Sequence, residues 1–237
     1  MSKIIFGDPF QILREYGAVY DSPVKDGHRV GPMVMYAGID PKTKKNFVGY
    51  IYFNIARAEQ PFKVRQYFSN LISRLIIDEV GTPDTIISAP MGGITFGVSI
   101  ANILQAESAF LEKIVTVPGD LLQGIKEKSK LALKRHKIEP KARVVIMEDV
   151  CNNFSTTNQM IKEINQAGAE VIAIACIFNR SELTHWNNIP VIAAIDEPNP
   201  EYTQDDPEVL AFLASGGTIC SDVKAQWNNL QKIMNNA

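Results

Sequence analysis

Two adjacent acids, Glu148 and Asp149, follow a run of apolar residues, 144–147, that is typical of a buried strand. A short polar turn comes next, and the amphipathic segment 158–167 predicts a helix. Carboxylates accept hydrogen bonds from sugar hydroxyls, and the free N–H groups of a turn and a first helical turn receive a phosphate. This order therefore indicates a site for a ribose that carries a phosphate. The alternative is a plain strand–turn–helix edge of a parallel sheet.

The same stretch resembles the type I phosphoribosyltransferases. That family carries two acids, a hydrophobic pair and then a run close to Thr-Thr-Gly-Gly-Ser. The first half is matched by Glu148-Asp149-Val150-Cys151. The second half corresponds to residues that the resemblance assigns to binding phosphoribosyl diphosphate together with the acid pair: Asn152, Asn153, Phe154, Ser155 and Thr156.

Both glycines of the family motif are missing from this turn, where Phe154 and Ser155 stand instead. Glycine lets the backbone approach a phosphate closely and adopt a positive φ without steric cost. Asn tolerates a left-handed conformation, but Phe154 is not expected to adopt one. If the site is active, we expect the turn to present its N–H groups to the 5′-phosphate, with the Phe154 ring turned away.

A second glycine-containing turn follows the predicted strand 85–89 and precedes a predicted helix over 94–104. Its residues Met91, Gly92 and Gly93 would allow backbone amides to approach an anion, although Gly-Gly is also common in tight turns. The run from Ser88 to Ile94 resembles the pyrophosphate loop of one branch of the orotate phosphoribosyltransferases. The resemblance implies that these three residues bind the diphosphate.

The segment Phe110-Leu111-Glu112-Lys113 resembles the Phe-Ala-Glu-Lys of the same branch. By this resemblance Lys113 is a catalytic and diphosphate-binding residue, and a lysine at a strand end can neutralise a diphosphate as a mobile point charge. A solvated surface lysine is the alternative. The long basic stretch 118–137 corresponds to the family's flexible catalytic loop, so we expect a lid over the site that is mobile from about 118 to 130.

The resemblance also implies an orotate site. Arg180 stands in an Asp-Arg-Ser-like turn of the branch, and its guanidinium fork suits a carboxylate. A surface arginine after a strand is the alternative. Phe53, in a Tyr-Phe-Asn run, resembles the hood that lines the base pocket, and Asn152 is the third residue expected to contact orotate.

Composition narrows the class of protein. The chain has 237 residues, 46% hydrophobic content and a net charge of −2, so a nucleic acid or an anionic membrane is not expected as a partner. The three cysteines are odd in number and widely spaced, which predicts free thiols in the reducing cytoplasm. We expect no signal peptide, no membrane span and no Cys/His metal site.

Strands that alternate with helices predict an α/β fold: a mostly parallel sheet flanked by helices, with an N-terminal hood. We expect a single phosphoribosyltransferase domain with a hood over about 1–60, a core over about 61–195 and a tail over about 196–237. Helices are predicted over 62–80, 207–214 and 222–234, in addition to those above.

The implied activity is orotate phosphoribosyltransfer, which converts orotate and phosphoribosyl diphosphate to orotidine monophosphate and diphosphate. Lys113 and Asp149 are the expected catalytic residues, and Mg²⁺ is the expected cofactor, held by the diphosphate and ribose hydroxyls without a dedicated protein metal site. The resemblance implies a homodimer, because active sites of the family borrow the partner's loop. Two alternatives remain: a phosphoribosyltransferase for another nucleobase, and a non-catalytic nucleotide sensor, which Phe154 favours.

Overall fold

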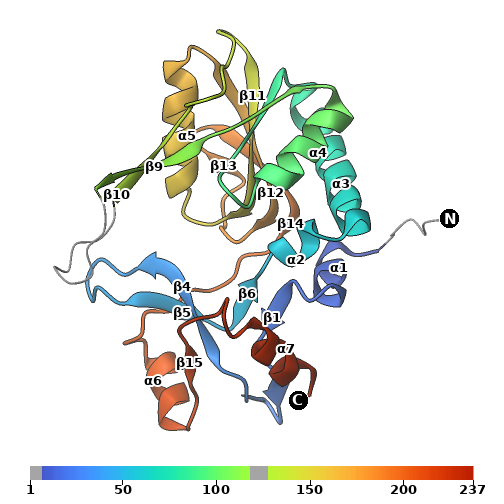
Figure 1. Ribbon diagram of the computed structural model, residues 1–237. Coiled ribbons are helices and arrows are strands. Elements are labelled where there is room, and N and C mark those ends of the chain that lie inside the picture. Colours follow the sequence, from blue (N-terminus) through green and yellow to red (C-terminus); the bar gives the residue numbers. More distant parts are fainter. Residues whose placement is uncertain (1–6, 118–127, 237) are drawn as a thin grey trace. The chain divides into compact units, whose positions relative to one another are not determined.

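A computed structural model describes residues 7–117 and 128–236, and the chain divides into two compact units (Figure 1). The first unit contains Glu59–Pro198 and the start of the chain. The second contains Phe10–Ala58 and Asn199–Ala237. Each unit has its own sheets, so each is described by itself.

The first unit is built on a six-stranded sheet with the order β13-β14-β12-β11-β7-β8. Five of its strands are parallel, and β13 alone runs antiparallel to its neighbour. The predicted α/β fold with a mostly parallel sheet is therefore confirmed. The strands of this sheet are β7 (Thr85–Ser88), β8 (Glu107–Phe110), β11 (Arg143–Cys151), β12 (Glu170–Asn179), β13 (His185–Trp186) and β14 (Ile189–Asp196).

Three helices cover this sheet: α3 (Phe62–Val80), α4 (Ile94–Leu104) and α5 (Ser155–Gln166). Figure 1 shows α5 on one face and the packed pair α3 and α4 on the other. The bounds of α3 and α4 are those that the helical spacing predicted. Helix α5 begins three residues before the predicted start at 158, because Ser155 to Thr157 already have helical backbone.

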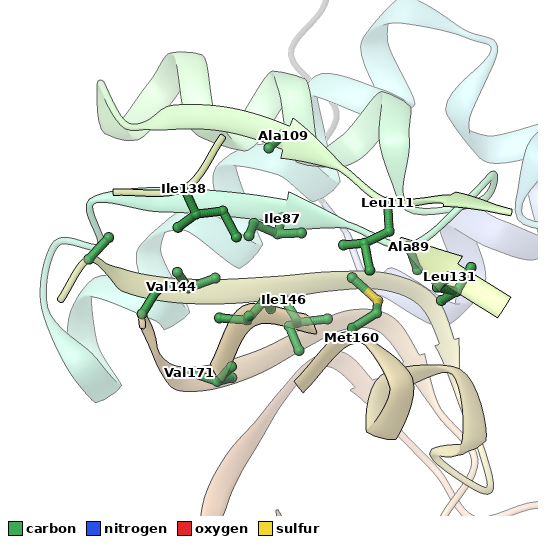
Figure 2. Packing of buried hydrophobic residues seen from close by; sticks show 13 residues of the cluster. Ile87, Ala89, Ala109, Leu111, Leu131, Ile138, Val144, Ile146, Met160 and Val171 are labelled. Carbon is green, nitrogen blue, oxygen red and sulfur yellow. The ribbon is translucent and has the colours of Figure 1, made fainter. Parts of the chain in front are cut away.

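The core under α5 follows from the alternation of side chains along β11. Figure 2 shows Val144 and Ile146 of β11 on the same side as Ile87 of β7 and close to Met160 of α5. Successive strand residues point to opposite faces, and the intervening Val145 is also fully buried. Strand β11, which carries the acid pair, is therefore a central strand that is buried on both faces.

The topology brings two turns together at the end of the sheet where the parallel strands have their carboxyl ends. Strand β7 pairs with both β8 and β11. The chain passes from β7 through α4 to β8 on one side, and from β11 through α5 to β12 on the other. The strand order therefore reverses between β7 and β11, and such switch points are where ligands bind in open α/β sheets.

A two-stranded hairpin occupies part of the predicted lid. Strand β9 (Glu112–Val117) pairs antiparallel with β10 (Lys128–Ala132), so the predicted loop conformation is wrong for Lys128 to Ala132. Residues 118–127, which contain most of the segment predicted to be mobile, lie outside the described residues.

The second unit joins most of the predicted hood to the tail. Its three-stranded sheet has the order β15-β4-β5, so a strand of the tail pairs with a strand of the hood. Tyr20 and Trp227 belong to its buried cluster. The other elements are α1 (Pro9–Glu15), β1 (Val19–Asp21), β2 (Val24–Lys25), β3 (His28–Arg29), β4 (Met33–Ile39), β5 (Asn46–Gly49), β6 (Ile51–Phe53), α2 (Ala56–Glu59), α6 (Pro207–Ala214), β15 (Ile219–Cys220) and α7 (Trp227–Asn235).

The bounds of the two predicted helices of the tail agree with the structure to different degrees. Helix α6 has the predicted bounds and is capped by Asp206, whose carboxylate accepts the Glu208 N–H at 2.9 Å. Helix α7 begins at Trp227, five residues later than predicted. Among the described residues, no helix combines the length and the apolar content that crossing a membrane requires.

Helix α4 offers a matched test of the packing in the first unit. Ile100 is fully buried, whereas Val98 on the same helix is 43% exposed. We expect Ile100→Ala to lower the free energy of unfolding by about 2–5 kcal/mol, because it leaves a cavity. Val98→Ala should change it by less than about 0.5 kcal/mol. Urea denaturation followed by circular dichroism measures both, and equal losses would contradict the packing described.

Candidate active site

The acid pair lies within β11, not after it. The strand continues through Val150 to Cys151, so the predicted end at Met147 is four residues too early. Glu148 and Asp149 therefore point to opposite faces of the sheet. The Glu148 carboxyl receives a hydrogen bond from the Thr157 hydroxyl of α5 at 3.4 Å. Asp149 turns to the face of α4, and its Oδ1 also accepts the Val150 N–H at 2.9 Å.

Burial separates the chemistry of the two acids. Glu148 is 8% exposed, and burial raises its pKa to about 8. The negative charge of Asp149 raises that pKa further, while the bond from Thr157 lowers it. Glu148 therefore retains its proton at neutral pH and can donate a hydrogen bond. Asp149 is only half-buried.

The turn between β7 and α4 lies directly against β11. A Cβ on Gly92 would stand 2.2 Å from Asp149 Oδ2, and a Cβ on Gly93 would stand 2.2 Å from the Met147 carbonyl oxygen. Neither φ lies in the left-handed region, so close approach is what requires these glycines. Met91, the third predicted residue of this turn, is 82% exposed.

A third acid near this turn was missed in the sequence analysis. Glu59, the last residue of α2, receives a hydrogen bond from the Thr95 side chain in the first turn of α4. Burial raises the pKa of Glu59, the Thr95 bond lowers it, and the charge of Asp149 raises it. No local pattern distinguishes Glu59, because its neighbours Thr95 and Asp149 are far along the chain.

The turn between β11 and α5 has the conformation that a glycine would favour. Phe154 has φ 54° and ψ 19°, so the expectation that it would avoid the left-handed region is wrong. Its ring is 3% exposed and packs in an apolar cluster with Cys151, Ile174 and Cys176. The Ser155 N–H donates to Asn153 Oδ1 at 3.1 Å, which closes the turn.

The N-terminus of α5 is suited to an anion. Its first turn contains Ser155, Thr156 and Thr157 and no acidic side chain. The first N–H groups of a helix have no partner within the helix, and the helix dipole is positive at this end. The Phe154 ring packs in the apolar cluster with Cys151, Ile174 and Cys176.

A cavity of about 520 Å³ brings together predicted residues from three different turns and strands. Met91, Lys113 and Thr156 all contribute to its wall, and so does Lys130 of β10. Glu112 lies in the same wall, where the Arg135 guanidinium donates to its carboxylate at 2.8 Å and lowers its pKa. The two lysines give the cavity a basic side.

Arg180 stands in a firmly held turn after β12. The backbone N–H of Arg180 donates to the Cys151 carbonyl oxygen at 2.8 Å, which joins this turn to the end of β11. The buried Asn179 organises the turn: its Nδ2 donates to Leu183 O at 3.1 Å and to Asp196 Oδ1 at 2.9 Å. Its Oδ1 accepts from the Ser181 hydroxyl at 2.7 Å. The sequence analysis assigned no role to Asn179.

The two remaining predicted residues are Asn152 and Phe53. Asn152 is half-buried between Cys151 and the turn. Phe53 belongs to β6 of the second unit, where its ring lies edge-on to Phe10 with centroids 6.0 Å apart. The first unit alone therefore assembles the residues predicted for phosphoribosyl diphosphate, together with Arg180.

Comparison with known proteins agrees with this architecture. Residues 63–196, more than half of the chain, match the phosphoribosyl transferase domain, so the chain belongs to the phosphoribosyltransferase family. The orotate phosphoribosyltransferase of Caulobacter vibrioides is 29% identical over 144 residues, which are 60% of this chain and 68% of that relative. The orotate phosphoribosyltransferase of Maricaulis maris is 25% identical over 158 residues, 65% of this chain and 75% of that relative.

The fold has solved counterparts. The crystal structure of orotate phosphoribosyltransferase from Aeropyrum pernix has a TM-score of 0.57 to this chain at 14% sequence identity. The match covers 87% of this chain and 98% of that one, and it shows a shared fold.

The protonation of Glu148 predicts a pH dependence of stability. Between its ordinary pKa of 4.5 and its folded value of about 8, the folded state holds a proton that the unfolded state has lost. Stability therefore falls as pH rises through this window, by at most about 1.4 kcal/mol per pH unit. Glu148→Gln should lack this loss, so its stability relative to the natural chain should rise from about pH 5 to pH 8 and then level off.

Urea denaturation at several pH values measures this difference. Glu139→Gln, at an exposed position, controls for the loss of a carboxyl group. Parallel pH profiles for the natural chain and Glu148→Gln would contradict a protonated Glu148.

Proposed function

We propose that this protein is an orotate phosphoribosyltransferase, which transfers a phosphoribosyl group from phosphoribosyl diphosphate to orotate. The observation that carries the proposal is that the turns after β7 and β11, both suited to an anion, line one cavity at the switch point, where Gly92 lies against the Asp149 side chain. The names of the Caulobacter vibrioides and Maricaulis maris relatives support orotate as the base.

Each part of the site has a role in this reaction. The 5′-phosphate binds at the N-terminus of α5, where Ser155 and Thr156 add hydroxyl donors. Asp149 accepts a hydrogen bond from a ribose hydroxyl, and the protonated Glu148 donates one. The diphosphate binds against the amides of Gly92 and Gly93, and Lys113 neutralises part of its charge.

The chemistry places electrostatic demands on these groups. The bond between the anomeric carbon and the diphosphate oxygen breaks, and a ring nitrogen of orotate forms the new bond to that carbon. The proton of that nitrogen is lost to the released diphosphate. Positive charge develops on the ribose as the diphosphate leaves. The Asp149 carboxylate stabilises this charge, and Lys113 stabilises the leaving diphosphate as a mobile point charge.

Magnesium fits this site as a cofactor bound mainly through the substrate. Among the described residues, no group of three or more His, Cys, Asp or Glu side chains is arranged to hold a metal ion. Mg²⁺ commonly keeps several waters and takes one or two carboxylates together with substrate phosphates. Asp149 would help to hold such an ion through a water molecule, and the ion would neutralise charge on the diphosphate.

The base-binding side of the site rests on Arg180. Its guanidinium binds the orotate carboxylate, on a turn that Asn179 holds in place. Asn152, in the same unit, is a second proposed orotate contact, and the role of Phe53, in the second unit, stays a prediction from the sequence. We also propose that the protein acts in the cytoplasm, which its three buried free cysteines support, and that it acts as a homodimer, as the family resemblance implies.

Phe154 no longer favours a non-catalytic relative. Its ring packs in the apolar cluster, so the feature that favoured a nucleotide sensor gives that alternative no support. A different nucleobase is the competing activity. Incubation with phosphoribosyl diphosphate, Mg²⁺ and orotate should consume orotate and release diphosphate. Consumption of another base in place of orotate would contradict the substrate assigned, and no turnover with any base would contradict the activity.

Arg180→Lys tests the orotate assignment. The variant keeps the charge but loses the two-pronged hydrogen bond to a carboxylate. We expect the KM for orotate to rise about tenfold or more, since a hydrogen bond to a charged group is worth roughly 1.5–3 kcal/mol. The KM for phosphoribosyl diphosphate should stay nearly constant.

Steady-state kinetics with each substrate varied in turn measure both constants. Arg74→Lys, at an exposed position of α3, is the matched control. If both constants rise together, Arg180 does not bind the base.

A further inference from the structure

The entry to α5 holds a bulky residue where a glycine is expected. Phe154 has a positive φ of 54° and directly precedes the first helical residue. In this region the Cβ of an L-residue crowds its own backbone, so the conformation costs free energy unless other contacts stabilise it. Something in the surrounding structure must therefore hold Phe154 in place.

The Phe154 ring is held by a face-to-face stack with Trp186. The ring centroids are 4.7 Å apart and the planes differ by 11°. The Phe154 ring also packs in a buried cluster with Cys151, Ile174 and Cys176. The stack therefore fixes the direction of the ring, and with it the backbone conformation that carries the ring.

Trp186 also reaches the first turn of α5. Its indole N–H donates to Asn158 Oδ1 at 2.8 Å. The backbone N–H of Asn158 in turn donates to the Phe154 carbonyl oxygen at 2.8 Å. The Trp186 side chain thus contacts both Phe154, which precedes the helix, and Asn158 in the first turn of the helix.

Trp186 is itself on a rigid support. It belongs to β13, which pairs antiparallel with β14 through Trp186 and Ile189. The two residues between them, Asn187 and Asn188, have φ values of 52° and 63°. Two successive positive φ values characterise the tight hairpin turns that match the twist of the strands. The hairpin therefore positions the indole without a flexible connection.

We propose that Trp186 is a positioning residue for the 5′-phosphate of the substrate. By stacking on Phe154 it maintains the left-handed conformation that a glycine would adopt unaided, and so keeps the first N–H groups of α5 directed at the phosphate. This inference rests on the proposed function, because it assigns the phosphate to that helix end. It explains how a turn without glycine retains the geometry of an anion-binding turn.

Three variants test the proposal: Trp186→Ala, Phe154→Gly, and the two combined. Without the indole, Phe154 should leave the left-handed region, so Trp186→Ala should weaken ribose 5-phosphate binding about tenfold. In the double variant, glycine adopts the positive φ without a ring to be held. Binding should then return to within about threefold of the natural chain, although a second buried side chain has been removed.

A purely structural role for Trp186 makes the opposite prediction. If Trp186 only contributes to packing, the double variant should bind no better than Trp186→Ala. Trp186→Phe keeps a stacking ring but lacks the N–H donor to Asn158, so we expect an intermediate loss. Trp227→Phe, in the second unit, is the matched control and should bind ribose 5-phosphate normally; it also leaves Trp186 as the sole tryptophan for fluorescence, since the chain has two.

Calorimetric titration with ribose 5-phosphate, alongside turnover assays with phosphoribosyl diphosphate and orotate, separates the two proposals. Weaker binding by Trp186→Ala and recovery in the double variant support the positioning role, even if the natural chain turns over no base. Normal binding by Trp186→Ala, or no recovery in the double variant, overturns the positioning role. In that case, turnover by the natural chain leaves the proposed function intact. No binding of ribose 5-phosphate by the natural chain overturns the positioning role, and the turnover assay decides the proposed function separately.

Discussion

The site depends on the direct contact between the turn after β7 and the backbone of β11. Gly92 and Gly93 have no side chains, so this turn lies against the Met147 carbonyl and the Asp149 carboxylate, where a Cβ would stand 2.2 Å away in each case. Parallel pairing places Ser88, the last residue of β7, beside Met147, so the acid pair lies in the part of β11 that continues past the end of β7. The proposed site depends on this contact, because it places the turn that we propose to bind diphosphate beside Asp149.

The charges around this contact are complementary to a phosphorylated sugar. Helices α4 and α5 both begin at this edge of the sheet, and neither has an acid in its first turn. Their dipoles leave positive charge for phosphate groups. Burial keeps Glu148 protonated near neutral pH, so two adjacent acids do not double the negative charge. In the proposed reaction, Asp149 is then the acid that faces the sugar as a carboxylate.

Local sequence patterns could predict the framework but not the long-range contacts. Apolar spacing correctly delimited α3 and α4, because each of these helices buries one continuous face. The acid pair and the Gly-Gly turn were recognisable because short motifs carry them. The extension of β11 beyond Met147 was missed, since polar residues within a strand look like its end.

The residues that escaped prediction act through partners distant in the chain. The conformation of Phe154 depends on Trp186, and the local pattern gives only the steric cost of the left-handed region. Asn179 acts through Asp196, and Glu59 lies near Asp149 only because of the fold. Such contacts have no signature within a single stretch of sequence.

Titration of phosphoribosyl diphosphate with Mg²⁺ into the natural chain and into Asp149→Asn tests the central claim most directly. The claim is that the switch point beside Asp149 binds this substrate. The account predicts that the natural chain binds and that Asp149→Asn binds about tenfold more weakly or worse, because a hydrogen bond to a charged group is worth roughly 1.5–3 kcal/mol. The circular dichroism spectrum of the variant should be unchanged. Equal affinity for the two proteins, or no binding by the natural chain, would contradict it.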